Sequence, residues 1–134
     1  MKGYIKNIGE AVKENENFRQ VVYTAKHCQL VLMSLKPGED IGEEVHDNVD
    51  QFFRFEEGSG KAVLDGVEHE IVAEFAVLVP AGTKHNIINT SDSDSLKLYT
   101  IYSPPNHKNG TIHVTKADAV AEEGKEHFDG QTTE

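Results

Sequence analysis

The sequence predicts an all-β fold of the sandwich or barrel type that ends in one short helix. Short runs rich in β-branched and aromatic residues alternate with turn residues along most of the chain. An Asp-Gly dipeptide at 65–66 lies between two such runs, and both of its residues can adopt the positive φ angles of a type I′ hairpin turn. The length of 134 residues suits one domain with a sizeable core.

The expected strands end at recognisable turn residues. The second stops at Lys-Pro-Gly (36–38), the third at Glu-Glu-Gly-Ser-Gly (56–60), the sixth at Pro80 and the last at Pro104. In chain order the strands cover 21–24, 29–35, 50–55, 61–64, 67–72, 75–79, 85–89 and 96–102. Residues 8–17 fit either a helical turn or irregular structure.

The end of the chain follows a different pattern. Thr115 and Asp118 have the spacing of a helix-capping box, and the run 119–123 ends at Gly124, so one short helix is expected there. Residues 125–134 are polar and are expected to be flexible. We therefore predict a single domain over 1–134, with a β core at about 20–103 and a loop and helix at 104–124.

The amino-acid composition disfavours several classes of binding partner. Acidic residues number 23 against 13 basic ones, a formal charge of −10 that disfavours nucleic acid and anionic membranes. The lone Cys28 permits no internal disulfide and is expected to be a small core residue. No stretch resembles a signal peptide or approaches the roughly 20 apolar residues of a membrane span, so a soluble, cytoplasmic protein is expected.

Four side chains suggest a metal site. Glu44 and His46 are two positions apart and leave a strand on the same face. Gln51 follows across a bend, and His85 comes from a distant strand that a closed barrel would bring to the same interior. Two imidazoles, a carboxylate and an amide oxygen suit a divalent ion such as Zn, Mn or Fe. The alternatives are that Glu44 is an exposed acid next to Glu43, and that Gln51 holds a metal-bound water or only orients a neighbour.

These residues resemble the two motifs of the cupin superfamily, G-x5-H-x-H-x4-E-x6-G and G-x5-P-x-G-x2-H-x3-N. The matching positions are Gly38, His46 and Gly58 in the first motif, and Pro80, Gly82, His85 and Asn89 in the second. The resemblance covers about residues 20–103. It implies a jelly-roll barrel (the double-stranded β-helix) with His46 and His85 as metal ligands.

Three positions depart from the motifs. Glu44 stands where the family usually has its first His, Gln51 where it has Glu, and Glu74 where the second motif opens with Gly. The site thus keeps one carboxylate, while an amide replaces one imidazole. Glutamine, glutamate and two histidines also form the zinc site of type I phosphomannose isomerases, which share the cupin barrel. The chain is similar to small cupins described as sugar-isomerase-like.

The resemblance leaves three functions open: a sugar or sugar-phosphate isomerase, an iron-dependent dioxygenase, and a non-catalytic module that binds a small ligand. The candidate acid–base residues are His107, His113 and Glu43. Candidate anchors for an anionic substrate are Lys84, Arg54 and Lys97. Because small barrels often pair through exposed strand edges, a homodimer is expected, with residues 1–20 covering or exchanging at such an edge.

Overall fold

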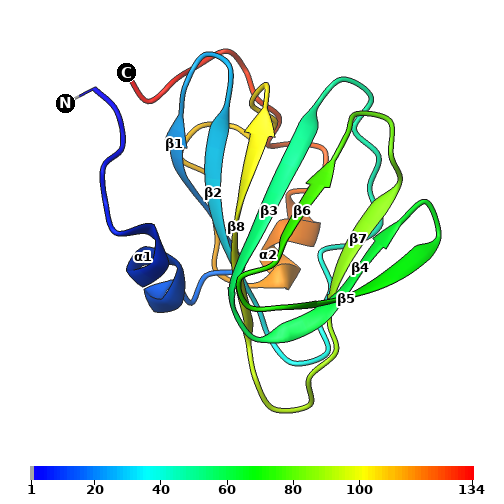
Figure 1. Cartoon of the computed structure of the whole chain (residues 1–134). Coiled ribbons are helices and arrows are strands. Elements are labelled where there is room, and N and C mark those ends of the chain that lie inside the picture. Colours follow the sequence, from blue (N-terminus) through cyan, green and yellow to red (C-terminus); the bar gives the residue numbers. More distant parts are fainter. Residues whose placement is uncertain (1) are drawn as a thin grey trace.

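The computed structural model describes residues 2–134 as two antiparallel sheets that face each other (Figure 1). The large sheet has the order β6-β3-β8-β2-β1-β9, and the small sheet has the order β5-β4-β7. The large sheet comprises β1 (Arg19–Thr24), β2 (Gln29–Leu35), β3 (Asp50–Glu57), β6 (Ala76–Val79), β8 (Leu96–Ser103) and β9 (Ile112–His113). The small sheet comprises β4 (Ser59–Leu64), β5 (Val67–Val72) and β7 (His85–Asn89).

The all-β jelly roll with a C-terminal helix is confirmed. All eight expected strands are present, and α2 (Lys116–Ala121) begins at the Thr115 capping box. Residues 8–17, which the sequence left undecided, contain α1 (Ile8–Glu14), whose first turn is capped by the Asn7 side chain. The short edge strand β9 was not anticipated.

Two turns show why particular residues occupy them. Asp65 and Gly66 have φ angles of 48° and 82°, so the expected hairpin joins β4 and β5 with both central residues at positive φ. Glu74 has a φ of 76°, a left-handed conformation that favours glycine. A glycine at this position of the second cupin motif is thus explained by backbone geometry, and Glu74 retains the turn despite its side chain.

The barrel interior contains a row of polar side chains beside its apolar core. Gln51 lies opposite Tyr102, Tyr102 opposite Gln29, and Gln29 opposite Thr24 across four neighbouring strands. All four are buried, and we call them the polar row. The adjacent row consists of Phe53, Val31 and Val21, which are apolar, and Thr100, whose hydroxyl accepts a hydrogen bond from Gln51. Because buried polar groups need partners, the polar row marks the part of the interior where function is expected.

The N-terminal segment packs on its own chain. The Lys97 ammonium, on the outer face of β8, donates to the Lys13 carbonyl and to Glu16, each at 2.7 Å, and so ties the end of α1 to the large sheet. Figure 1 shows α1 beside this sheet and both termini at one end of the molecule. Within residues 2–134 no helix has the length and apolar character that crossing a membrane requires.

Two expectations differ from the structure. Cys28 is exposed, because it belongs to the turn between β1 and β2 and not to the apolar strand that follows it. Residues 125–134, expected to be flexible, make hydrogen bonds with the barrel: Phe128 N–H donates to the Asn106 carbonyl, and Thr133 N–H to the Thr24 carbonyl. These partners are backbone groups of distant segments, which local polarity does not reveal.

Candidate metal centre and cavity

Backbone pairing places Glu44 next to His85. The two residues form an isolated antiparallel bridge in which each N–H donates to the other's carbonyl at 2.9 Å. The segment before His46 therefore extends the small sheet along β7, and directly paired residues project their side chains to the same face. This bridge brings the segment of the first motif, with Glu44, next to the segment of the second motif, with His85.

His85 and Gln51 meet in the interior. His85 Nδ1 lies 2.9 Å from the Thr83 carbonyl, which can only accept, so Nδ1 carries a proton, and in the neutral tautomer Nε2 carries a lone pair. That lone pair faces Gln51 Oε1 at 3.2 Å. The Gln51 amide nitrogen is directed to the Thr100 hydroxyl at 3.0 Å. With Nε2 protonated, Nε2 donates to Gln51 Oε1; in the neutral tautomer, either the amide rotates by half a turn to donate to Nε2, or a cation lies between the two acceptors.

Glu44 and His46 form a second pair. Glu44 Oε2 lies 3.3 Å from His46 Nε2, yet this buried nitrogen has no hydrogen-bond partner of acceptable geometry. Burial raises the pKa of the Glu44 carboxyl, but the close approach and charge of His46, with the charge of Arg19, outweigh it. The net pKa lies below its usual value, so Glu44 is ionised and available as a ligand.

The donor types suit a divalent ion, and the separation within each pair suits neighbouring ligands. Neighbouring ligands around one ion, with bonds of about 2.1 Å, are about 3 Å apart, close to the separation within each pair. The Thr83 carbonyl on His85 Nδ1 is the outer partner that metal-bound histidines usually have. The ring centroids of His46 and His85 are 5.4 Å apart. Within residues 2–134, no three His, Cys, Asp or Glu side chains, Glu44, His46 and His85 included, are arranged to hold an ion in this structure.

A cavity of about 340 Å³ opens beside this site. Its walls are the start of β1, residues 41–46, the loop at 106–107, and α2 with residues 123–127. Glu44 and His46 reach the cavity wall, whereas Gln51 and His85 lie deeper, with exposures of 3% and 5%. The C-terminal segment thus covers the open side of the barrel next to the candidate ligands.

A hydrogen-bonded chain runs from the cavity into the polar row. Glu126 Oε2 accepts from His107 Nδ1 at 2.6 Å, and His107 Nε2 lies 3.0 Å from the Tyr102 hydroxyl. Burial lowers the pKa of His107 and outweighs the opposing effect of Glu126, so the ring is neutral and its Nε2 accepts from Tyr102. For Glu126, burial raises the pKa, but the hydrogen bond and charge of His107 bring it below its usual value.

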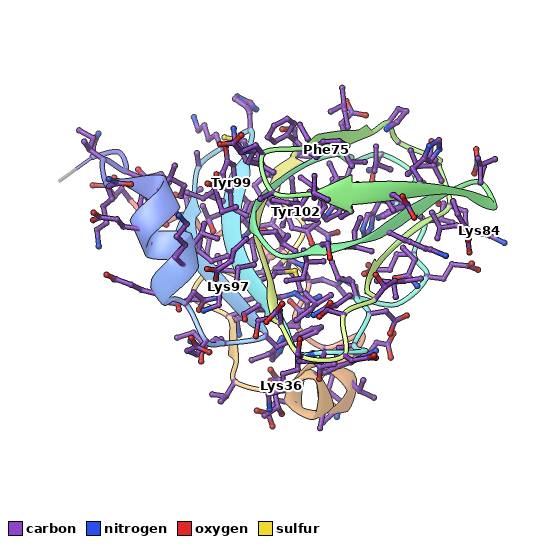
Figure 2. The ribbon with its side chains drawn as sticks, turned by 60° about the horizontal axis from the view of Figure 1, so that its bottom comes forward. Lys36, Phe75, Lys84, Lys97, Tyr99 and Tyr102 are labelled. Carbon is purple, nitrogen blue, oxygen red and sulfur yellow. The ribbon has the colours of Figure 1, made fainter. Side chains whose placement is uncertain are left out.

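Tyr102 connects this chain to the candidate ligands. Its ring meets that of His46 edge-on, with centroids 6.0 Å apart, and it lies opposite Gln51 in the sheet. Burial raises the pKa of its hydroxyl, which therefore stays protonated and donates to His107. Figure 2 shows Tyr102 among the strands in the interior, whereas Lys84 lies at the periphery.

Gln29 of the polar row fixes the position of His107. Its Oε1 accepts from the backbone N–H groups of Asn106 and His107, and its Nε2 donates to the His107 carbonyl at 2.8 Å. One buried amide thus binds the loop that leaves β8 and directs His107 inward. The sequence offered His107 as a candidate acid–base residue but gave no sign of this anchor.

The other predicted site residues lie elsewhere. Glu43 lines the cavity, but its carboxylate pairs with the exposed Lys84 at 3.6 Å. His113 is buried at 1% exposure, and its ring bridges Arg19 and Glu122 without lining the cavity. It is a structural link more than an acid–base group.

The anchors suggested for an anionic substrate lie away from the cavity. Arg54 pairs with Glu56, and Lys97 holds α1 on the outer face. None of Lys84, Arg54 and Lys97 lines the cavity. Arg19 does line it, and sequence reasoning missed this residue because it stands beside Phe18 in a run without any motif.

A small jelly-roll barrel with inward-facing His, Glu and Gln donors defines the general class of this protein. The family model described as "Cupin domain" matches residues 31–102, more than half of the chain. The chain therefore belongs to the cupin family.

Close relatives extend over almost the whole chain. It is 50% identical over 128 residues to the uncharacterized protein YrkC of Bacillus subtilis (strain 168). The matched region covers 91% of this chain and 68% of that protein. This chain is 45% identical over 116 residues to the uncharacterized protein L612 of Acanthamoeba polyphaga mimivirus, covering 84% and 72% of the two. The crystal structure of BH2720 from Bacillus halodurans matches with a TM-score of 0.87 and 44% identity, covering 90% of this chain and 95% of that one.

Proposed function

We propose that this protein binds one divalent metal ion through Glu44, His46, Gln51 and His85 and catalyses proton transfer on a small polyhydroxy compound, as a sugar or sugar-phosphate isomerase does. The observation behind the proposal is that an acid–base chain, Glu126–His107–Tyr102, ends beside the candidate ligands. A proton acceptor and a set of metal donors in one interior are what an aldose–ketose isomerisation needs.

The metal would be held by the two donor pairs. Zn, Mn and Fe all accept nitrogen and oxygen ligands of these types. When bound, the ion supplies Lewis-acid stabilisation of the negative charge that develops on a substrate carbonyl oxygen. Four protein ligands leave coordination positions for a small ligand on an ion that accepts five or six.

The substrate proton would move through the hydrogen-bonded series Tyr102–His107–Glu126. Glu126 fixes the His107 tautomer with the proton on Nδ1, so Nε2 is the basic atom. As the Tyr102 oxygen takes a proton from the substrate, the hydroxyl's own proton passes to Nε2, and the return step reverses both transfers. General acid–base catalysis of this kind contributes about 10²- to 10⁴-fold to the rate.

The first experiment measures metal content by mass spectrometry in protein purified without added metal. We expect about one divalent ion per chain in the wild type and none in the His46→Ala/His85→Ala double variant, which should keep the β-sheet circular dichroism spectrum. The matched control is His27→Ala/His69→Ala, because both of these imidazoles are exposed. Metal retained by the His46/His85 variant would refute the site.

The second experiment separates the possible reactions. A panel of aldoses, ketoses and their phosphates is assayed for interconversion, with oxygen uptake measured in parallel. Tyr102→Phe should keep the metal and lose most of the isomerase activity, since it removes the hydroxyl and leaves the ring. Stoichiometric iron with oxygen uptake would instead indicate a dioxygenase, and a metal-free protein that binds a sugar would indicate a binding module.

A further inference from the structure

Arg19 is a buried cation in the cavity wall. It is the first residue of β1, and its exposure is 6%. Its Nη1 lies 3.2 Å from His113 Nδ1, while its Nε is buried and has no hydrogen-bond partner. Within residues 2–134, no carboxylate forms an ion pair with this guanidinium.

A buried guanidinium in this state has unused binding capacity. The group stays charged at all ordinary pH values and carries five N–H donors in a fixed plane. The Phe18 ring, 5.4 Å from Cζ, offers a cation–π contact but accepts no hydrogen bond along the edge formed by Nε and Nη2. Because a buried charge without a counter-ion is costly, a ligand anion is the economical partner for that edge.

Most of the other charged groups of the cavity have partners, but Glu123 also lines it and forms no ion pair within residues 2–134. Lys116 pairs with Asp40, Glu44 with His46, and Glu126 with His107. Arg19 has no carboxylate in direct ion-pair contact within the described residues, although Glu44 and Glu126 are near enough for its charge to lower their pKa. Arg19 lines the cavity, and Arg binds the two oxygens of a carboxylate or phosphate with two parallel hydrogen bonds; a small movement of the side chain would have to uncover the buried Nε for this contact.

We infer that Arg19 binds the carboxylate or phosphate group of the substrate, so the substrate is a small oxyanion that spans the cavity from Arg19 to the metal centre. This inference rests on the proposed function, because the metal ion offsets the acidic groups nearby. A volume of about 340 Å³ suits a molecule of this size. The overall charge of −10 opposes long-range attraction, so the specificity comes from these local contacts.

Nuclear magnetic resonance tests this site directly. Arg19 and Arg54 are the two arginines of the chain, so the Nε–H region of a ¹⁵N-labelled sample contains two signals, which the Arg54→Gln variant assigns. Protein with its native metal is titrated with inorganic phosphate and, separately, with glycolate. We expect a saturable shift of the Arg19 signal, while Arg54, which pairs with Glu56 and does not line the cavity, stays unchanged.

Two variants measure the contribution of the guanidinium. Arg19→Gln should weaken anion binding in calorimetry by about 10- to 100-fold, since a charge-assisted bidentate contact is lost. Arg19→Lys keeps the charge but loses the fork, and should give an intermediate affinity. Both should keep the metal content of the wild type. Anion affinity unchanged in Arg19→Gln would overturn the inference.

The outcomes separate this inference from the proposed function. A shift with phosphate alone identifies a phosphorylated substrate, and a shift with glycolate alone identifies a hydroxy acid. No saturable shift of Arg19 in metal-loaded protein refutes the inference and leaves the metal centre intact. A saturable shift in protein that contains no metal supports the anion site and refutes the proposed metal function. If Arg19→Gln does not fold, the wild-type titration and the affinity of Arg19→Lys still show whether Arg19 binds the anion.

Discussion

Replacing His107 with glutamine should weaken the dependence of stability on pH between about pH 7.5 and 5.5. An imidazole in the unfolded chain titrates near pH 6.5, whereas burial holds the pKa of folded His107 lower. Below the unfolded pKa the unfolded state therefore binds more protons, so stability falls as the pH falls and is fully present only above it. Glutamine does not titrate, and this contribution disappears.

The size of the effect follows from that difference in protonation. If folded His107 stays neutral over this interval, the unfolded state gains almost a full proton, and the free energy of unfolding falls by about 1.4 kcal/mol. For a domain of this length that corresponds to about 4 °C in Tm. Glu126 does not contribute here: its pKa is lowered, so its stabilising effect is present above about pH 4.5 and is lost only at lower pH.

Urea unfolding at both pH values, with a chelator present, measures this quantity. The wild type should lose about 1.4 kcal/mol more than His107→Gln on moving to the lower pH. His69→Gln, which replaces an exposed imidazole, is the control and should follow the wild type. Equal pH dependence in the wild type and His107→Gln would show that His107 is not held neutral by burial.

Three further predictions concern the backbone and the assembly. Glu74→Gly should raise the free energy of unfolding by about 0.5 kcal/mol, because it removes a side chain from a positive-φ position, while Gly82→Ala, at a φ of 86°, should lower it by about 1 kcal/mol. Chemical denaturation checks both, and opposite signs would contradict the account of these turns. Gly60→Ala should cost about 1–3 kcal/mol, since its Cβ would overlap the Ile88 carbonyl of the paired strand; a thermal melt equal to the wild type would contradict this. Light scattering should show a homodimer, and Leu78→Lys on the edge strand β6, where Leu78 is 66% exposed, should give a monomer; a dimer retained by this variant would exclude that edge.

The strands could be predicted because local composition determines them. Period-two alternation in β3 buries Gln51, Phe53 and Phe55 on one face, and the positive-φ requirement of residues 65–66 locates a hairpin without any tertiary information. Cys28 was misjudged because a turn and the adjoining strand differ by one residue there. Its exposure depends on where β2 begins, and sequence patterns locate such boundaries poorly.

The candidate donors could be predicted because the two motifs fix their spacing. The hydrogen-bonded chain to Glu126 could not, because it joins residues from three regions: β8, the loop after it and the C-terminal segment. The role of Arg19 could not be predicted for a related reason. Its importance comes from an Nε atom without a hydrogen-bond partner and from the lack of an ion pair in the folded state, and neither can be read from the sequence.

Two kinds of structure form the walls of the cavity: sheet backbone on one side, and a short helix with a loop on the other. The donors Glu44, Gln51 and His85 sit on backbone held by hydrogen bonds to neighbouring strands, whereas residues 116–127 close the opposite side with a short helix and a loop. Substitutions, insertions or deletions in 116–127 can therefore reshape what the cavity admits while the donor pairs keep their places. In protein engineering, this stretch is where libraries for altered ligand preference belong, with the barrel kept as a constant scaffold.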